Sequence, residues 1–471
     1  VLTLTAVNGA AGNVGTGVTG SNGGSFTIAA NGDYSFDPGT NFDDLAVGQT
    51  RTTAVSYTIS DGAGGASTAT VTITVTGTND TPVSTAIPAQ TSNDGNAVAL
   101  DVSPHFADVD TGDVLTFSVG GLPPGLGINP NTGVISGSLD HSASVTGPYT
   151  VTVTATDANG ATTARTFTWT VNNPAPAAIA NTGATAENAT TSGNVLADDS
   201  DPDGDTLTVS AVNGVAGNVG IATTGSNGGS FTIGSNGLYT FDPGTAFDDL
   251  AVGETRTTTV SYTISDGEGG TSSTTVTITV TGTNDGPVST AIPDLAHNDS
   301  DVVNVSVSSF FSDPDASDVL TFGASSLPPG LSIDSATGTI SGTLAANASA
   351  GGPYSVTITA TDPWGAVTTQ TFNWIVTNVP PEAYDDFDGT TENSLVVGNV
   401  LANDVDPDGD PLIVAAVNGG TGNVGESVAG TQGGSFIIQA DGTYTFIPGT
   451  DFDNLAAGET RSTSIKYTAD D

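Results

Sequence analysis

The sequence has no cysteine, so disulfide bonds contribute nothing to the stability of its 471 residues. Basic residues are almost as scarce: five Lys and Arg stand against 50 Asp and Glu, which gives a formal net charge of −45. A surface this negative repels nucleic acid and anionic membranes, so neither class of partner is expected. No apolar run approaches the roughly 18 residues of a membrane-spanning helix, and we predict no membrane span.

The acidic residues that are present are nearly all Asp, which is favoured in turns and offers oxygen ligands on a short side chain. Gly, at 62 residues, reaches about twice its usual share of ~7%. Charge and glycine alone would indicate disorder. However, 36% of the residues are hydrophobic and they alternate regularly with polar ones, which indicates folded β-structure.

Internal repetition is the most prominent feature of the sequence. The strings AVNG (starting at 6, 211 and 416), GGSF (23, 228 and 433) and LPPGL (122 and 327) recur at steps of 205 residues. This period is too long for one solenoid unit and indicates two alternating modules of about 100 residues each. We expect A modules at 1–80 (partial), 174–285 and 379–471 (partial), and B modules at 81–173 and 286–378. The partial modules are interpreted as cuts from a longer array, or as open sandwiches that a neighbouring chain completes.

The local patterns predict strands almost everywhere. In 274–282, for example, Val276, Ile278 and Val280 alternate with threonine, which is typical of a strand with one buried face. Turn signals such as NGG, DG and PPG separate these segments at hairpin spacing. Seven or so short strands in about 100 residues fit an immunoglobulin-like sandwich. We therefore predict an all-β fold, a tandem array of immunoglobulin/cadherin-like β-sandwich modules with very little helix.

Longer motifs carry a family resemblance. The segment 247–285 (FDDLAVGETRTTTVSYTISDGEGGTSSTTVTITVTGTND) resembles the VCBS repeats of bacterial giant surface adhesins, and 194–209 (NVLADDSDPDGDTLTV) resembles the acidic start that VCBS and cadherin-like bacterial repeats share. The B-module segments 311–322, 327–343 and 354–376 resemble putative-Ig or dystroglycan-type cadherin-like domains. The resemblance implies calcium-stabilised β-sandwich stalks of exported adhesins, many of which use type I secretion.

The A modules contain an acidic loop of the form D-x-D-x-D-G, which matches the first half of an EF-hand calcium loop. The second half differs, because the position of the bidentate Glu is Ser210 in one copy and Ala415 in the other. We therefore predict an EF-like turn on a β-scaffold that takes further ligands from elsewhere. The candidate metal ligands, with the nearest additional acids, are Asp199, Asp201, Asp203, Asp205, Asp404, Asp406, Asp408 and Asp410.

The B modules carry acids of their own near the A-to-B linker GTND. This linker resembles the Asn–Asp linker of cadherins, where successive domains share calcium, and in that pattern an acid near the top of a module joins the site. Asp61 and Asp266 are weaker candidates. The predicted ligands in this group are Asp108, Asp110, Asp113, Asp157, Asp313, Asp315, Asp318, Asp362, the linker residues Asn79, Asp80, Asn284 and Asp285, and Glu187 and Glu392.

Charge repulsion decides between turn residues and cation ligands. Two carboxylates about 4 Å apart repel by roughly 4 kcal/mol at an effective dielectric of about 20. Isolated turn Asp residues need no compensation, but the clusters do, and five basic residues cannot supply it. Ca²⁺ is favoured over Mg²⁺ because it accepts six to eight oxygen ligands in flexible geometry. Three His and no Cys argue against Zn²⁺.

The repeat also tests for catalytic residues, because a shared role should recur. His105, His141 and His297 align with Phe310, Ala346 and Ser92, so we interpret the histidines as surface or filler residues. No Ser-His-Asp set recurs, and no enzyme activity is predicted. The recurring Arg51, Arg256 and Arg461 are predicted to form structural ion pairs or loop clamps, Trp169 and Trp374 to pack in the core, and Trp364 to contact a neighbouring module or a glycan.

These observations favour a non-catalytic, extracellular stalk or fibre segment of a bacterial surface adhesin, whose partners are calcium ions and its own neighbouring modules. Its five modules would reach roughly 180–200 Å end to end. The alternatives are a self-assembling filament that contacts other copies of the chain, and a module that binds surface glycans. The B-to-A linkers, 171–178 and 376–383, contain fewer acids than GTND, so we expect them to bind calcium less well and to bend more.

Overall fold

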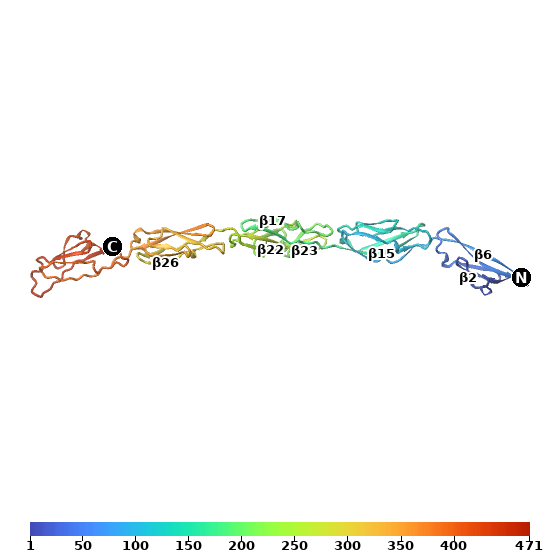
Figure 1. Ribbon diagram of the computed structural model, residues 1–471, viewed down its shortest axis with the longest axis horizontal. Helices are drawn as coiled ribbons and strands as arrows, with labels where there is room; N and C mark the ends of the chain where they lie inside the picture. Colours follow the sequence, from blue (N-terminus) through green and yellow to red (C-terminus); the bar gives the residue numbers. More distant parts are fainter.

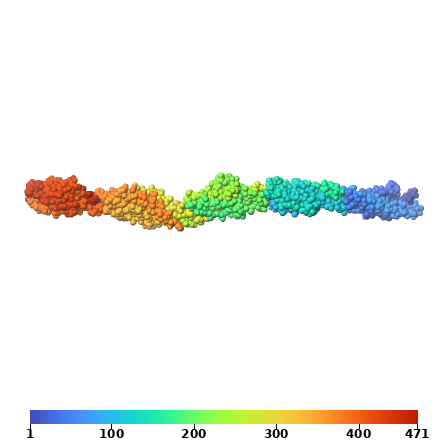
Figure 2. All heavy atoms as spheres, turned by 90° about the horizontal axis from the view of Figure 1, so that it is seen from above, coloured from blue at the N-terminus to red at the C-terminus, as the bar shows by residue number.

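The computed structural model describes residues 1–471 and confirms the predicted all-β architecture. Five separate hydrophobic clusters follow one another along the chain, and the molecule is an extended rod (Figures 1 and 2). No helix is long or apolar enough to cross a membrane. The helical segments are 3-10 turns at Ala11–Asn13, Gly39–Phe42, Ser103–His105, Ala143–Thr146, Ala216–Asn218, Ser308–Phe310, Ala348–Gly351 and Thr421–Asn423.

The second A module is a sandwich of two four-stranded sheets, ordered β16-β23-β22-β18 and β17-β21-β20-β19. The predicted alternation places Val276, Ile278 and Val280 fully inside, while their threonine neighbours are half-buried on the opposite face. The strands are β16 (Asn181–Ala186), β17 (Thr191–Asn194), β18 (Thr208–Val212), β19 (Thr223–Thr224), β20 (Ser230–Ile233), β21 (Leu238–Asp242), β22 (Thr255–Ser265) and β23 (Thr271–Thr281).

The second B module has a four-stranded sheet, β25-β32-β31-β28, opposite a three-stranded one, β26-β30-β29, with the short pair β24-β27 beside them. Trp374 is fully buried in its core, and Trp169 is 1% exposed in the first B module, so the predicted core role of both is confirmed. The strands are β24 (Val288–Ser289), β25 (Leu295–Asn298), β26 (Val302–Ser306), β27 (Phe311–Ser312), β28 (Thr321–Ser325), β29 (Leu331–Ile333), β30 (Thr339–Thr343), β31 (Tyr354–Thr361) and β32 (Val367–Thr377).

The first B module repeats the arrangement of the second, whereas the first and third A modules carry the A arrangement in part, with sheets of three and three strands and of four and two strands. The first A module contains β1 (Thr3–Val7), β2 (Gly17–Thr19), β3 (Ser25–Ile28), β4 (Tyr34–Asp37), β5 (Thr50–Ser60) and β6 (Ala66–Thr76). The first B module contains β7 (Val83–Ser84), β8 (Gln90–Asn93), β9 (Ala97–Asp101), β10 (Phe106–Ala107), β11 (Thr116–Gly120), β12 (Leu126–Ile128), β13 (Val134–Ser138), β14 (Tyr149–Thr156) and β15 (Thr162–Asn172). The third A module contains β33 (Val396–Asn399), β34 (Ile413–Val417), β35 (Ser427–Ala429), β36 (Ser435–Ile438), β37 (Thr443–Ile447) and β38 (Tyr467–Asp470).

The rod shape follows from how the first and last strands pair. In the first B, second A and second B modules, the first long strand lies parallel to the last one, as β8 to β15, β16 to β23 and β25 to β32. Two parallel strands run from the same end of a sandwich to the other, so the chain enters a module at one end and leaves at the opposite end. Successive modules are therefore joined end to end, and loops of neighbouring modules meet at each junction (Figure 1).

Candidate metal centres

The A-to-B junctions gather the acids that the sequence analysis singled out in the B modules. Carboxylate oxygens of Asp313, Asp315 and Asp318 lie within 4.8 Å of one another at the second of these junctions. At the first junction the corresponding group is Asp108, Asp113 and Asp157. Asp110 and Asp315 are almost completely buried, at 2% and 1% exposure.

The linker is hydrogen-bonded to this acidic loop. The Asp285 amide donates to Asp315 Oδ2 (3.1 Å), and Asn284 Nδ2 donates to Asp362 Oδ2 (2.9 Å), at the end of β31. The first junction has the same contacts, from the Asp80 amide to Asp110 Oδ2 (3.0 Å) and from Asn79 Nδ2 to Asp157 Oδ2 (2.8 Å). The linker and the B module therefore hold one another in a fixed arrangement.

Several oxygens in this arrangement are buried and accept no hydrogen bond from the protein. Burial also raises the pKa of Asp315 to about 6, and the charges of Asp318 and Asp285 add to the effect. A buried acceptor without a donor costs about 1–3 kcal/mol, and more when it is charged. Oxygen-only ligands in a flexible loop fit Ca²⁺. The unpartnered oxygens at the second junction are Asp313 Oδ2, Asp315 Oδ1, Asp318 Oδ2 and Asn284 Oδ1.

The two predicted glutamates differ in their surroundings. Glu187 directly follows β16 and is 1% exposed; its Oε1 accepts a hydrogen bond from the Thr283 hydroxyl (2.8 Å), while Oε2 has no partner. Thr283 immediately precedes the Asn284–Asp285 linker, so Glu187 lies where the sequence analysis expected it. Glu392 is only partly buried and its side chain contacts its own neighbour, Asn393. It joins none of the acidic groups.

A loop of the preceding A module completes the A-to-B junction. The Asp249 carbonyl accepts a hydrogen bond from the Ala316 amide across the junction (3.3 Å), and the Asp249 carboxylate forms a bidentate ion pair with Arg256 (2.9 and 2.7 Å). The ion-pair prediction is confirmed for Arg256 and for Arg51, which pairs with Asp44. Arg461 instead donates to the amide oxygen of Asn454, because that position is not an acid in the third A module.

Arg256→Ala should loosen this contact without unfolding the module. Exposed ion pairs contribute up to ~1 kcal/mol, so we expect amide hydrogen exchange at Ala316 to accelerate by up to about fivefold. Thr111, whose amide donates to the Asp44 carbonyl at the equivalent first junction, is the internal control and should exchange at its original rate. Equal changes at both amides would contradict the clamp role of Arg256.

The B-to-A junctions also gather acids. Asp201, Asp203 and Asp205 form one group, and Asp406, Asp408 and Asp471 form the other. Burial, with the neighbouring Asp201, raises the pKa of Asp203 to about 7, and neither of its carboxylate oxygens has a hydrogen-bond partner. The pKa of Asp408 is raised to about 6 for the same reasons. Asp410 lies beside the second group, and its pKa is raised by burial and by the charges of Asp406, Asp471 and Asp299.

Asp199 and Asp404 depart from the expectation that they join these groups. Asp199 Oδ1 accepts from the Ile179 amide (2.7 Å) and Oδ2 from the hydroxyl of the buried Tyr262 (3.4 Å). Asp404 accepts from the Tyr384 amide and the Tyr467 hydroxyl in the same way. Protein donors already satisfy both carboxylates, so the structure gives these first acids of each loop a role in fixing the loop rather than in an ion group.

The sequence analysis missed Asp94 and Asp299. Each directly follows the first long strand of a B module, is 2% exposed and has one oxygen, Oδ2, without a partner. The Asp94 amide donates to the Asn172 carbonyl at the end of the last strand, as the Glu187 amide does to Thr281. Asp94 and Glu187 therefore occupy the same place in the two module types. The sequence shows that this Asp recurs, at positions 94 and 299. It does not show that the position corresponds to Glu187, because B modules cannot be aligned with A modules without the structure.

The expectation that B-to-A joints are poor in acids holds only for the linker itself. Loops of the following A module supply the acids that the linker lacks: Asn173 of the linker donates from Nδ2 to Asp266 Oδ2 (2.8 Å), and Asp205 pairs with His141 of the preceding module (2.8 Å). Hydrogen bonding to Asp205 raises the pKa of His141. His141, interpreted from the sequence as a surface or filler residue, is thus part of the junction.

Trp364 lies at the second A-to-B junction. Its side chain is exposed (61%) and lines a surface hollow together with Ala251 and Val252 of the preceding module and Asp318 of its own.

The fold and its junctions define the class of protein, a rod of tandem immunoglobulin-like and cadherin-like β-sandwiches. Family models identify the individual domains: a "Putative Ig domain" at 81–172 and 286–377, a "Bacterial cadherin-like domain" at 172–282 and a "Bacterial Ig domain" at 1–74 and 378–471. The chain therefore carries three kinds of bacterial or immunoglobulin-like domain in tandem. Domains of these classes are typically not catalytic.

Among solved structures, the chain is similar to Drosophila N-cadherin EC1-4 (16% identity over 75% of this chain and 90% of that one, TM-score 0.31). It is also similar to mouse cadherin-23 EC22-24 (15% identity over 64% of this chain and all of that one, TM-score 0.33). Human desmocollin-1 ectodomain covers 94% of this chain at 15% identity, with a TM-score of 0.27. A comparison with curated proteins finds no match.

Proposed function

We propose that this chain is a non-catalytic stalk segment of an extracellular bacterial adhesin, built from VCBS-like A modules and cadherin-like B modules and stiffened by calcium at its junctions. The observation that carries the proposal is the recurrence of buried, unpartnered carboxylate oxygens wherever one sandwich meets the next. A buried ionised carboxylate is costly unless a cation or a set of donors compensates it. With five basic residues in the chain, bound metal is the available source of positive charge.

The proposed calcium ligands follow from this geometry. At the A-to-B junctions they are the acidic loop of the B module, the end-of-strand Asp157 or Asp362, the linker Asn–Asp pair and, at the second junction, Glu187. At the second B-to-A junction they are Asp406, Asp408 and Asp410 together with Asp299, and at the first they are Asp201 and Asp203. We propose module boundaries at 80/81, 173/174, 285/286 and 378/379, so that every boundary falls between two sets of ligand loops.

Calcium dependence would let such a stalk stay unfolded inside the cell and fold outside it. In low cytosolic calcium the repelling acids oppose folding, which suits export, and the millimolar calcium outside the cell then stabilises the rod. A chain of this kind holds a terminal binding domain away from the cell surface. The binding domain there serves adhesion or biofilm formation. Type I secretion, a common route among the adhesins that the sequence resembles, is part of this proposal.

Small-angle X-ray scattering of the full chain tests the stalk function. In millimolar calcium we expect the scattering of a stiff monomeric rod with a maximum dimension of roughly 180–200 Å. Excess EGTA should replace it with the scattering of a flexible, partly unfolded chain, and restored calcium should reverse the change. Magnesium at the same concentration is the control and should rescue poorly, because it demands near-octahedral geometry and dehydrates reluctantly.

The same experiment separates the stalk from a self-assembling filament. A stalk segment keeps the mass of one chain over a wide range of protein concentration, whereas a filament subunit grows in mass with concentration in the presence of calcium. An unchanged scattering curve in EGTA would overturn the calcium-stiffened stalk.

A further inference from the structure

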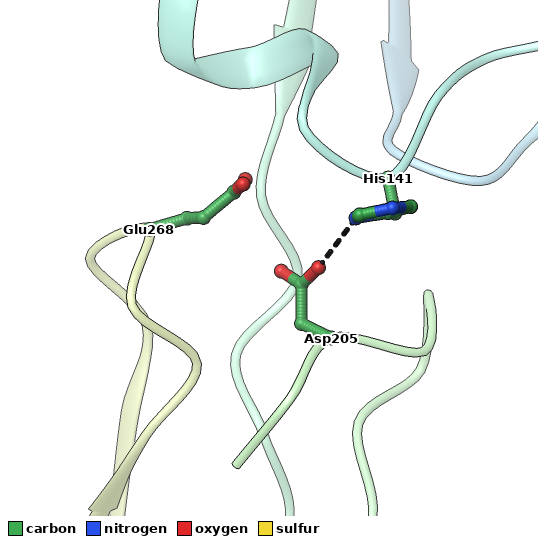
Figure 3. A group of neighbouring side chains, drawn as sticks. All are labelled: His141, Asp205 and Glu268. Atoms are coloured by element: carbon green, nitrogen blue, oxygen red, sulfur yellow. Dashed lines mark hydrogen bonds and ion pairs between the residues drawn. The ribbon is translucent and has the colours of Figure 1, made fainter. Parts of the chain in front are cut away.

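A histidine lies among the acids of the first B-to-A junction. Figure 3 shows His141, which comes from the first B module, with Asp205 and Glu268, which come from two loops of the second A module. One ligand atom from each of the three lies within 4.8 Å of the others. His141 Nδ1 and Asp205 Oδ1 are already 2.8 Å apart. The three side chains thus converge from two modules on one point.

The carboxylates around this point have oxygen atoms that are free to bind a metal ion. The Asp205 side chain is only 5% exposed, and its Oδ2 has no hydrogen-bond partner. Glu268 Oε2 is likewise buried without a partner, and the carboxylate projects toward the space beside Asp205 and His141 (Figure 3). Asp94, 2% exposed with an unpartnered Oδ2, lies close enough for its charge to act on Glu268.

The chemistry of this donor set differs from that of the other junctions. Ca²⁺ takes oxygen ligands, whereas an imidazole nitrogen combined with two or three carboxylates suits Zn²⁺. The small number of histidines argued against zinc in the sequence, but here one histidine converges with two carboxylates from the next module. We propose that His141, Asp205 and Glu268, with Asp94 as a nearby fourth carboxylate, form a zinc-binding site that ties the first B module to the second A module. The proposal concerns this junction alone, because Ala346 occupies the equivalent position at the second B-to-A junction.

Calorimetric titration of the full chain with zinc chloride, in millimolar calcium, tests the site. The expected result is one high-affinity zinc per chain. His141→Ala should weaken that binding by at least tenfold, because losing even an outer-shell partner of a metal site costs about 10–100-fold. His141 is mostly exposed and packs in no core, so the variant should fold, and an unchanged far-ultraviolet circular dichroism spectrum in calcium verifies this.

His105→Ala is the matched control. His105 lies in the same module and contacts Thr85, away from the acidic groups, so its loss should leave zinc affinity unchanged.

Cobalt substituted for zinc should give the visible absorption of a tetrahedral site with nitrogen and oxygen ligands, and H141A should abolish it. Zinc binding that is absent, or that persists at full affinity in H141A, would overturn the site. Either result leaves the calcium-dependent melting of the same samples intact, so failure of the zinc site is distinguishable from failure of the stalk proposal.

Discussion

Excess EDTA is expected to lower the melting temperature of each complete module by roughly 10–20 °C. A ligand held at 100 times its dissociation constant stabilises the folded state by about 2.7 kcal/mol per site. For a domain of about 100 residues, 1 kcal/mol shifts the midpoint by roughly 4–8 °C. Differential scanning calorimetry of the full chain in calcium and in EDTA measures the shift, and the first B, second A and second B modules, which are flanked by junctions on both sides, should move most.

Asp315→Asn locates the effect at one junction. The amide keeps the shape of the side chain and removes a charge from a carboxylate that is 1% exposed. The variant should therefore lose much of the calcium-dependent shift of the second B module. In EDTA it should melt at the same temperature as the original chain or higher, because the repulsion from Asp313 and Asp318 is relieved.

Asp334→Asn is the matched control for this experiment. Asp334 belongs to the same module, but its carboxylate caps an exposed turn by accepting from the Thr337 and Ala336 amides. The variant should keep the full response to EDTA. A calcium-dependent shift of equal size in Asp315→Asn and in the original chain would contradict the assignment of Asp315 as a ligand.

Without calcium, the chain is expected to become less stable as the pH rises from about 4 to 7. Burial raises the folded-state pKa of Asp203 to about 7 and of Asp315 and Asp408 to about 6, above the ordinary value of 3.8. The folded state therefore binds protons more tightly than the unfolded state between these values. The contribution of these groups to stability is complete below pH 3.8 and is lost as the pH rises through the folded-state pKa.

Calcium should reverse this dependence, because the ion binds the ionised carboxylates and competes with protons. Melting curves at pH 5 and pH 7.5 measure both conditions: in EDTA the midpoint should be higher at pH 5, and in calcium it should be higher at pH 7.5. Asp203→Asn should flatten the dependence in EDTA, since one of the groups with a raised pKa is gone. A midpoint in EDTA that rises with pH would show that these carboxylates are compensated by the protein itself.

The sequence by itself determined the all-β fold. Alternation of Val276, Ile278 and Val280 with threonine requires a strand with one buried face, whatever the strand packs against. It also predicted that the acids within one loop, such as Asp313, Asp315 and Asp318, lie close together, because five or six residues of a turn cannot place their side chains far apart. Both features depend on neighbours in the chain, and neighbours are visible in a sequence.

Only the tertiary structure decided which loops of different modules meet. Gly95, the residue after Asp94, and Asp203 are more than a hundred residues apart, and they come together because parallel first and last strands place module ends against one another. The same geometry places His141 against Asp205, and it places Asp199 beside Tyr262, where protein donors satisfy it. No local pattern carries this information, because the distance between two loops depends on the packing of the sandwiches that hold them.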